Sequence, residues 1–348
     1  MKALFLAGGI GSRLKAMTKN LPKPMIPVMG KPLLARNIAR LKKFGIDEII
    51  LSTCYLPEKI REYFGDGHRF GMQIAYVHEQ KALGTAGAIR NAAKYFHETF
   101  LAFNGDIVSD IHLDRMVAMH REKKAAVTIA ATRVENPSAY GVIEYDEANY
   151  IRAFKEKPQP GETDSHLINA GIYLFEPEVL QEIPTNRNVS VEKETYPRLL
   201  SKGYRLAVYD EKAYWRDLGT PRDYLAFHQD IFEQRHRLPP EDRSANVYGI
   251  CPGAKIDARA SLIEPVYIAR DVQVGAHCVI GPYASLEKGT VVDHGVELDH
   301  CVVWPGAHIG PNAAVSDAIV LGDSTIQAGS HCRHEIVAGT VPPVCEAG

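Results

Sequence analysis

The residues best suited to chemistry stand near the N-terminus, where a short apolar run ends in a glycine-rich loop. The loop holds three glycines within four positions: Gly8, Gly9 and Gly11. Glycines let the backbone turn tightly and bring its N–H groups against an anion. Arg13 and Lys23 add positive charge nearby. The pattern predicts a strand that leads into a phosphate-binding loop, and therefore a nucleotide ligand.

This loop differs from the two commonest nucleotide-binding loops. A dinucleotide-binding fingerprint requires glycine where Leu14 stands, and a P-loop requires Lys followed by Ser or Thr after its last glycine. Both classes are therefore excluded. The competing interpretation is a plain glycine turn after a strand, with Arg13 and Lys23 merely solvated.

Two aspartates could hold a divalent cation. Asp106 follows an apolar strand that begins at Phe100, and ligands bind at the carboxyl ends of strands in α/β folds. Asp217 supplies a second carboxylate near the end of the same domain. Carboxylate oxygens suit Mg²⁺, which one or two carboxylates usually hold on nucleotide phosphates. The two carboxylates could therefore serve a Mg²⁺ site, although each aspartate taken alone fits a turn or helix-cap residue better.

Two further segments could bind the rest of the substrates. Glu79-Gln80 and the segment 83–87 end one strand and open a helix, which suits a loop that reads a base. The alternative is a capping loop with Thr85 as N-cap. Segments 154–158 and 168–171 combine charged and amide groups that could hold sugar hydroxyls and a second phosphate.

Length and composition limit the classes of protein. A chain of 348 residues is long enough for two domains. Lys and Arg number 40 against 42 Asp and Glu, so the net charge of -2 gives no reason to expect nucleic acid or a membrane surface as partner. Six cysteines without short regular spacing favour a reducing cytoplasm over a zinc site or disulfide framework. No apolar run reaches transmembrane length.

Up to about residue 230, strand-like runs alternate with amphipathic stretches, which predicts an α/β domain with a mainly parallel sheet. The clearest expected elements are strands over 47–53, 73–78, 100–104 and 126–132, and helices over 32–44 and 85–96.

From about residue 247, aliphatic residues recur every six positions. They are Ile256, Leu262, Ile268, Val274, Ile280, Leu286, Val292 and Leu298, then, after a shift of one, Val303, Ile309, Val315 and Leu321. Such hexapeptides are the unit of a β-helix of roughly four to five coils. The expected organisation is a first domain over 1–230, a linker over 231–247, a β-helix over 248–332 and a tail over 333–348.

Five sequence blocks occur in the order typical of one family. GGIGSRL with LPKP, then NGD, EKP, INAG and WRDLG, resemble the signatures of the sugar-1-phosphate nucleotidyltransferases over nearly the whole chain. HEQKALGTAG, NPSAYGVIEYD, SVEKETYP and YWRDLGTPRDYL resemble most the GDP-mannose pyrophosphorylases. Two departures are Ser12 for the usual Thr, and Lys15-Ala16-Met17-Thr18 for the usual Arg-Pro-Leu-Thr.

The resemblance implies a Rossmann-like nucleotidyltransferase domain followed by a left-handed parallel β-helix. It also implies that a sugar-1-phosphate, mannose-1-phosphate in the GDP-mannose pyrophosphorylases, attacks the α-phosphorus of a nucleoside triphosphate such as GTP and releases pyrophosphate without a covalent intermediate. Arg13 would neutralise the pyrophosphate and Lys23 the α-phosphate region. Asp106 and Asp217 would hold Mg²⁺, the one implied cofactor.

The resemblance assigns further contacts residue by residue. Nucleotide contacts are implied for Leu6, Gly8, Gly9, Gly11, Ser12, Glu79, Gln80, Gly84, Thr85 and Gly105. Sugar-phosphate contacts are implied for Gly141, Glu156, Lys157, Asn169 and Gly171. The expected partners are the two substrates and further copies of the chain through the β-helix, with no nucleic acid or membrane, in the cytoplasm.

Three alternatives stay open at this point. The same chemistry could use another pair: a thymidylyl or uridylyl group with glucose-1-phosphate, or a guanylyl group with a heptose or cyclitol phosphate. The β-helix could be an acyltransferase with a histidine as general base; the candidates are His277, His294, His300, His308 and His331. The chain could also be a regulatory homologue without catalysis, against which the intact Arg13, Lys23, Asp106 and Asp217 argue.

Overall fold

The computed structural model describes residues 1–9, 11–238 and 249–342. They divide into two compact units. Unit 1 consists of Met1–Ile10, Pro22–Pro24 and Asn37–Asp217, and unit 2 of Gly11–Leu21, Met25–Arg36 and Leu218–Gly348. Unit 2 thus combines the repeat region with two short segments from near the N-terminus.

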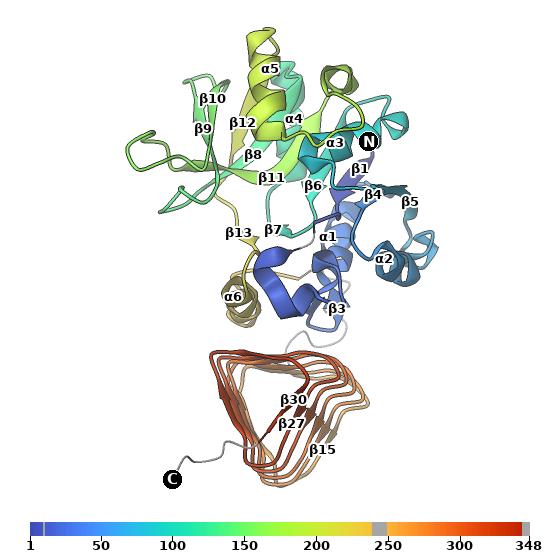
Figure 1. Cartoon of the computed structure of the whole chain (residues 1–348), viewed down its shortest axis with the longest axis vertical. Helices are drawn as coiled ribbons and strands as arrows, with labels where there is room; N and C mark the ends of the chain where they lie inside the picture. Colours follow the sequence, from blue (N-terminus) through green and yellow to red (C-terminus); the bar gives the residue numbers. More distant parts are fainter. Residues whose placement is uncertain (10, 239–248, 343–348) are drawn as a thin grey trace. The chain divides into compact units, whose positions relative to one another are not determined.

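Unit 1 is built on a nine-stranded sheet (Figure 1). Its strands are β1 (Ala3–Leu6), β4 (Glu48–Thr53), β5 (Gln73–His78), β6 (Phe100–Asn104), β8 (Val127–Arg133), β9 (Gly141–Tyr145), β10 (Ile151–Glu156), β11 (Leu167–Phe175) and β12 (Leu206–Asp210). The order is β10-β9-β11-β6-β1-β4-β5, with β8 also beside β11 and β12 beside β8. Strands β6, β1, β4 and β5 are mutually parallel, whereas β11 runs antiparallel to β6. The predicted Rossmann-like sheet is confirmed.

Helices join the strands of this sheet. They are α1 (Leu33–Lys42), whose first four residues belong to unit 2, α2 (Pro57–Phe64), α3 (Gly84–Asn91), α4 (Leu113–Lys123) and α5 (Tyr196–Ser201). The predicted helix over 85–96 is α3 followed by the short 3₁₀ helix η4 (Ala93–Tyr95). Leu4, Phe100 and Tyr173 are fully buried in the core, since strand residues on the covered faces of such a sheet are apolar.

Four short elements outside the nine-stranded sheet matter for the site. Lys23 begins the 3₁₀ helix η2 (Lys23–Met25). Strands β7 (Ile107–Ser109) and β13 (Trp215–Asp217) form a separate antiparallel ribbon. A π-helical turn, η6 (Val191–Thr195), precedes α5.

Unit 2 contains the 3₁₀ helix η1 (Ser12–Thr18), a hairpin of β2 (Pro27–Val28) and β3 (Lys31–Pro32), helix α6 (Pro221–Phe232) and the repeat region. Helix α6 begins at a capping box: the Thr220 hydroxyl accepts from the Asp223 backbone N–H, and the Asp223 carboxylate accepts from the Thr220 N–H.

The repeat region forms three all-parallel sheets, one along each side of the coils. The first contains β14 (Gly249–Ile250), β17 (Val266–Ile268), β20 (Ala284–Leu286), β23 (Val302–Val303), β26 (Ile319–Val320) and β29 (Ile336–Val337). The second contains β15 (Lys255–Ile256), β18 (Gln273–Val274), β21 (Val291–Val292), β24 (His308–Ile309), β27 (Thr325–Ile326) and β30 (Thr340–Val341). The third contains β16 (Ser261–Leu262), β19 (Val279–Ile280), β22 (Glu297–Asp299), β25 (Ala314–Ser316) and β28 (His331–Arg333). This arrangement is consistent with the predicted left-handed β-helix.

The aliphatic ladder follows the predicted positions with one correction. Ile280, Leu286 and Ile309 are fully buried, as expected. However, Val303 pairs with Val320, not with Leu321, and Val320 in turn pairs with Val337. The predicted place of Leu321 in the ladder is therefore wrong, because the repeat shortens by one residue a second time, between Val315 and Val320. Strands continue to Val341, beyond the residue 332 expected to end the repeat.

Among the residues that the structure describes, no helix is long and apolar enough to cross a membrane.

Candidate active site

The candidate site lies in unit 1, where several parallel strands end. Leu6, at the end of β1, pairs with Ser52 of β4 on one side and Asn104 of β6 on the other. The carboxyl ends of these strands therefore meet, which is where α/β folds bind ligands. A cavity of about 290 Å³ opens there. Its described lining residues are Leu6, Gly8, Gly9, Lys23, Pro24, Glu79, Ala82, Gly84, Thr85, Ala88, Asn104 and Asp106.

The first two glycines of the N-terminal loop line this cavity, and each has a different role. A Cβ on Gly8 would lie 3.0 Å from Glu79 Oε1 and 3.2 Å from Cys54 Cβ, so this position is too crowded for a side chain. A Cβ on Gly9 would meet nothing within 4 Å. The space beside the Gly9 backbone is open, as a loop that receives a phosphate requires.

Glu79 shapes the neighbouring loop. Its Oε1 accepts from the Ser52 hydroxyl at 2.8 Å, and its Oε2 accepts from the Leu83 N–H at 3.0 Å. Helix α3 then begins at Gly84, whose φ of +70° and lack of a Cβ let it lie against the Val189 carbonyl. Leu83 rather than Thr85 precedes the helix as its cap, which leaves Thr85 to line the cavity.

Gln80 and Gly105 lie beside this cavity's lining rather than in it, as far as the described residues go. Gln80 is exposed, and its contact with a base stays a prediction. Gly105 is pressed against β1: its N–H donates to the Leu6 carbonyl at 3.1 Å, and a Cβ there would lie 3.0 Å from the same oxygen. This close approach sets the direction in which Asp106 leaves β6.

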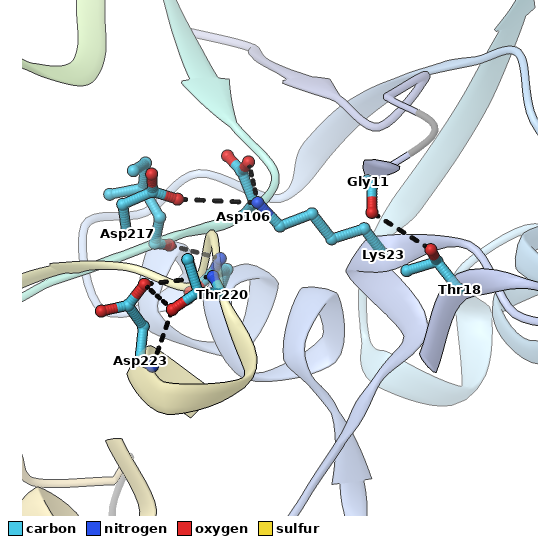
Figure 2. Close-up of polar contacts among 9 residues, drawn as sticks. Gly11, Thr18, Lys23, Asp106, Asp217, Thr220 and Asp223 are labelled. Carbon is cyan, nitrogen blue, oxygen red and sulfur yellow. Dashed lines mark hydrogen bonds and ion pairs between the residues drawn. The ribbon is translucent and has the colours of Figure 1, made fainter. Parts of the chain in front are cut away.

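Lys23 stands between the two predicted metal ligands (Figure 2). Its Nζ lies 2.5 Å from Asp106 Oδ2 and 3.6 Å from Asp217 Oδ1. The two aspartates are brought together by the β7–β13 ribbon, in which Asp217 pairs with Ile107, the residue after Asp106. The Lys23 side chain is only 7% exposed, so its charge acts with little screening.

This triad has the donor chemistry of a divalent cation site. Two carboxylates and one ammonium leave a net charge of -1, and carboxylate oxygens are the ligands that Mg²⁺ prefers. Among the described residues no group of three or more His, Cys, Asp or Glu is placed to hold a metal by itself. Two protein carboxylates therefore fit an ion that takes its remaining ligands from phosphates and water.

The predicted sugar-binding residues gather around a bulge in β11. Asn169 Oδ1 accepts from the Gly171 N–H at 2.9 Å, and Asn169 Nδ2 donates to the Tyr173 hydroxyl at 2.9 Å. A Cβ on Gly171, where φ is +75°, would lie 2.8 Å from Nδ2 of Asn104, which lines the nucleotide cavity. The bulge thus connects the two halves of the predicted site.

Glu192 belongs to this cluster although sequence reasoning gave it no role. Its Oε1 accepts from Asn169 Nδ2 at 3.2 Å and its Oε2 from the Ser190 hydroxyl at 3.0 Å. Burial raises the pKa of the Glu192 carboxyl, and Glu156 nearby raises it further. Glu192 lies in the block SVEKETYP, which carries part of the family resemblance, and the first residue of this block, Ser190, is the N-cap of η6. The resemblance of this block was the one sequence feature that could have indicated a role for Glu192.

The remaining predicted sugar-phosphate residues lie on β9 and at the end of β10. Gly141 pairs with Glu156, and a Cβ on Gly141 would lie 2.9 Å from Glu156 Oε2. The Lys157 side chain is 65% exposed, with its Nζ 4.0 Å from Glu156 Oε1. Lys157 is therefore open to a phosphate group.

Gly11, Ser12 and Arg13 belong to unit 2, and none of them is among the described residues of the cavity lining. Gly11 adopts φ of +67° as the N-cap of η1, and its carbonyl accepts from the Thr18 hydroxyl at 3.2 Å. The Arg13 guanidinium lies against Gly219, where a Cβ would be 2.7 Å from Arg13 Cζ. The predicted contacts of these three residues with the nucleotide stay predictions.

Comparison with protein families agrees with this geometry. The family model described as "Nucleotidyl transferase" matches residues 2–234, and that described as "GMPPB C-terminal domain" matches residues 262–345. The chain belongs to the nucleotidyl transferase family. The predicted family resemblance is thereby confirmed.

Individual relatives match most of the chain. A mannose-1-phosphate guanylyltransferase from Mycobacterium tuberculosis is 38% identical over 85% of this chain and 81% of its own. A UTP--glucose-1-phosphate uridylyltransferase from Synechocystis is 34% identical over 85% and 82%. Among solved structures, HddC from Yersinia pseudotuberculosis complexed with GMP-PN covers 65% of this chain and 96% of its own, with a TM-score of 0.56 and 28% identity.

Proposed function

We propose that this nucleotidyltransferase transfers the guanylyl group of GTP to mannose-1-phosphate, releasing pyrophosphate and forming GDP-mannose. The observation that carries the proposal is a cavity lined by Gly8, Gly9, Lys23 and Asp106, in which Lys23 also lies 3.6 Å from Asp217. The base and the sugar are proposed from relatives named mannose-1-phosphate guanylyltransferase and from a similar structure in complex with GMP-PN.

In the proposed reaction an oxygen of the sugar phosphate forms the new bond to the α-phosphorus, and the bond to the pyrophosphate oxygen breaks. The nucleophile is already an anion, so no proton needs to be removed. Catalysis then consists of positioning and charge neutralisation. Backbone N–H groups of Gly8 and Gly9 would orient the triphosphate, and Lys23 would stabilise charge at the α-phosphate. Arg13 would neutralise the leaving pyrophosphate.

Asp106 and Asp217 would hold Mg²⁺, which when bound offsets the negative charge of the phosphates. Without such an ion, two carboxylates would repel an incoming phosphate, and Lys23 alone leaves the triad negative. We therefore expect activity to require a divalent cation.

On the sugar side, Asn169, Glu156 and Glu192 would contact hydroxyl groups, and Lys157 the sugar phosphate. Carboxylates and amides in a partly buried cluster suit hydroxyls, because a polyol can satisfy acceptors that would otherwise lose water. Glu192 contributes an acceptor in addition to those predicted from the sequence.

A second candidate is uridylyl or thymidylyl transfer to glucose-1-phosphate. It is favoured by the relative named UTP--glucose-1-phosphate uridylyltransferase and by a structural likeness to a putative glucose-1-phosphate thymidylyltransferase from Bacillus anthracis, at 25% identity and a TM-score of 0.59. The transfer step and the residues proposed for it would be the same.

We further propose that the chain works in the cytoplasm as a homo-oligomer assembled through the β-helix. Acyl transfer by a β-helix histidine stays a separate hypothesis. Two of its candidates already pair with neighbouring acids: His308 Nε2 lies 2.8 Å from Asp293 Oδ2, and His300 Nδ1 lies 3.0 Å from Asp299 Oδ2.

The substrate pair is tested by measuring pyrophosphate release for each nucleoside triphosphate against each sugar-1-phosphate. We expect GTP with mannose-1-phosphate to exceed every other pair by at least ~10-fold in kcat/KM, since one lost specific hydrogen-bond contact is worth about that factor. Highest activity with UTP or dTTP and glucose-1-phosphate would support the second candidate, and no activity with any pair would contradict both.

A further inference from the structure

Unit 2 contains a buried carboxylate that the proposed chemistry does not use. Glu287 follows β20 in the β-helix and is only 1% exposed. Its Oε1 and Oε2 both accept from the Gly30 N–H, at 3.1 and 2.9 Å. Gly30 is the tip of the β2–β3 hairpin, so the contact joins residues 257 positions apart in the chain.

The tip of the hairpin is fitted closely to the β-helix around this contact. Gly30 has φ of +86°, and a Cβ there would lie 2.4 Å from the Tyr267 hydroxyl. Arg36 of α1 is also buried, and its guanidinium donates to the carbonyls of Val28 and Met29, one of these bonds at 2.7 Å. A side chain at position 30 would therefore clash with Tyr267.

A second chain of hydrogen bonds reaches the start of the same hairpin. Trp304 of the β-helix donates through Nε1 to the Tyr224 hydroxyl at 3.0 Å, and the Tyr224 hydroxyl donates to the Pro27 carbonyl. Tyr224 and Trp304 are both buried, at 0% and 6% exposure. The β-helix therefore fixes the hairpin at both its start and its tip.

The fixed hairpin is the direct continuation of the segment that carries Lys23. Only Pro24, Met25 and Ile26 separate Lys23 from Pro27, and Met25 and Ile26 are buried. Prolines at 22, 24 and 27 restrict the backbone angles on both sides of Lys23, and η2 adds a 3₁₀ turn. Lys23 and the hairpin are thus joined by a short segment of the chain with little backbone freedom.

We propose that Glu287 and Trp304 of the β-helix are positioning residues for Lys23, acting through the β2–β3 hairpin. The β-helix would then be part of the catalytic machinery as well as an assembly platform. This inference rests on the proposed role of Lys23 in nucleotidyl transfer, but not on the identity of the base or the sugar.

The first test compares kcat with KM in the full chain, using whichever substrate pair the unmodified protein turns over best. Glu287→Ala removes the acceptor for the hairpin and should lower kcat by ~10- to 10²-fold, the scale for displacing a catalytic group by about 1 Å. KM for the nucleotide should change little. Glu287→Gln keeps an oxygen that can accept from Gly30 and should recover most of kcat.

Ser324→Ala is the matched control. Ser324 is as buried in the β-helix as Glu287, and its hydroxyl donates to the Val337 carbonyl at 3.4 Å and accepts from the Gly339 N–H at 3.1 Å, both within the β-helix. Its replacement should lower the thermal midpoint and leave kcat unchanged. Equal losses of kcat in Ser324→Ala and Glu287→Ala would overturn the proposal, because both would then report general destabilisation.

A double-mutant cycle identifies the group through which Glu287 acts. Lys23→Arg keeps the charge but misplaces it, so Glu287→Ala should add little further loss in that background. Fully additive losses would overturn the proposal. If Glu287→Ala does not fold, Trp304→Phe replaces it in the cycle, since it removes only the donor to Tyr224; it should lower kcat in the same direction and non-additively with Lys23→Arg.

These outcomes are separate from those that test the substrate pair. If GTP and mannose-1-phosphate fail but another pair reacts, the proposed substrates are wrong and the cycle is still measured with the working pair. If Lys23→Arg itself has no effect on turnover with any pair, the role of Lys23 fails and the positioning proposal fails with it.

Discussion

The strand ends of unit 1 and the β-helix of unit 2 differ in where their charged side chains lie. In unit 1, Lys23, Asp106 and Asp217 gather at one point, and the resulting imbalance suits an anionic substrate with a cation. In the β-helix, the ladder inside the coils is aliphatic and fully buried at Ile280, and ionic groups lie outward. The difference shows that charge is concentrated where chemistry is proposed and excluded where regular stacking supplies stability.

Glu287 is the exception that connects the two patterns. It is a buried carboxylate in the β-helix, yet its partners are a hairpin amide and, nearby, the Arg36 guanidinium. The position of this exception coincides with the contact between the β-helix and the hairpin that follows Lys23.

Placing a charge inside the ladder should be the most damaging change. Ile280→Asp would bury an unpaired carboxylate in a fully buried position, at a cost of at least ~4 kcal/mol of unfolding free energy. Chemical denaturation would measure the loss of stability, and light scattering the loss of the proposed assembly. Val279→Asp is the control, because the preceding side chain points to the other face of the strand and is half-buried. Equal stability of the two variants would contradict the ladder.

Removing a charge from the unit 1 triad should affect turnover instead of folding. Asp106→Asn and Asp217→Asn should each lower kcat by at least ~10²-fold, the scale for one preorganised electrostatic contact. Thermal melting should be nearly unchanged. Near-normal turnover in Asp106→Asn with a continuing requirement for Mg²⁺ would exclude that residue from the mechanism.

The pH dependence of stability should report the buried charge of Glu287. Burial raises its pKa from 4.5 to about 7, against the opposing effects of the Gly30 and Met29 amides and of Arg36. The folded state therefore binds the proton of the Glu287 carboxyl more tightly than the unfolded state does. This proton binding stabilises the fold fully below pH 4.5, and the stabilisation is lost as the pH rises through about 7. The loss corresponds to about 3 kcal/mol.

Comparing the unmodified protein with Glu287→Gln isolates this contribution. The two buried tyrosines facing Glu287, Tyr224 and Tyr267, have pKa values raised by burial and stay neutral in this range. Burial lowers the pKa of His228 to about 4, which destabilises the fold as pH falls below 6.5 and acts equally in both proteins. A difference in unfolding free energy that is constant between pH 4.5 and 8 would contradict the assignment.

The smallest effect is expected for Arg13, which is exposed. Arg13→Ala should lower kcat by roughly tenfold, as for one lost hydrogen bond to a charged group, with less change in nucleotide KM if its charge acts on the departing pyrophosphate. Arg13→Lys should retain only part of the kcat that Arg13→Ala loses, because lysine lacks the planar guanidinium group that can form two parallel hydrogen bonds. An effect confined to KM would make Arg13 a ground-state contact only.

Local patterns predicted much of the fold and part of the site. The strands at 73–78 and 100–104 match the structure, because apolar runs bounded by polar turns determine them locally. Asp106 could be placed at the ligand edge for the same reason. The shortened repeat before Val320 was missed, since one aliphatic residue next to another satisfies either register in the sequence.

Contacts between distant segments were beyond the reach of such patterns. The approach of Asp217 to Lys23 depends on the pairing of β7 with β13, more than 100 residues apart, and the family resemblance rather than spacing suggested it. Glu192 and Glu287 read as ordinary surface acids in the sequence, and only tertiary packing buries them. Gly11 to Arg13 belong to unit 2, whereas Gly8 and Gly9 belong to unit 1.

The most direct test of the account follows the phosphorus atoms themselves. ³¹P NMR of the full chain with GTP, mannose-1-phosphate and Mg²⁺ should show the triphosphate and sugar-phosphate signals falling together while pyrophosphate and a diphosphate diester rise in equal amounts. Asp106→Asn under the same conditions should leave the spectrum unchanged over the same period. Formation of orthophosphate with GDP, or consumption of GTP without loss of the sugar phosphate, would contradict nucleotidyl transfer to a sugar-1-phosphate.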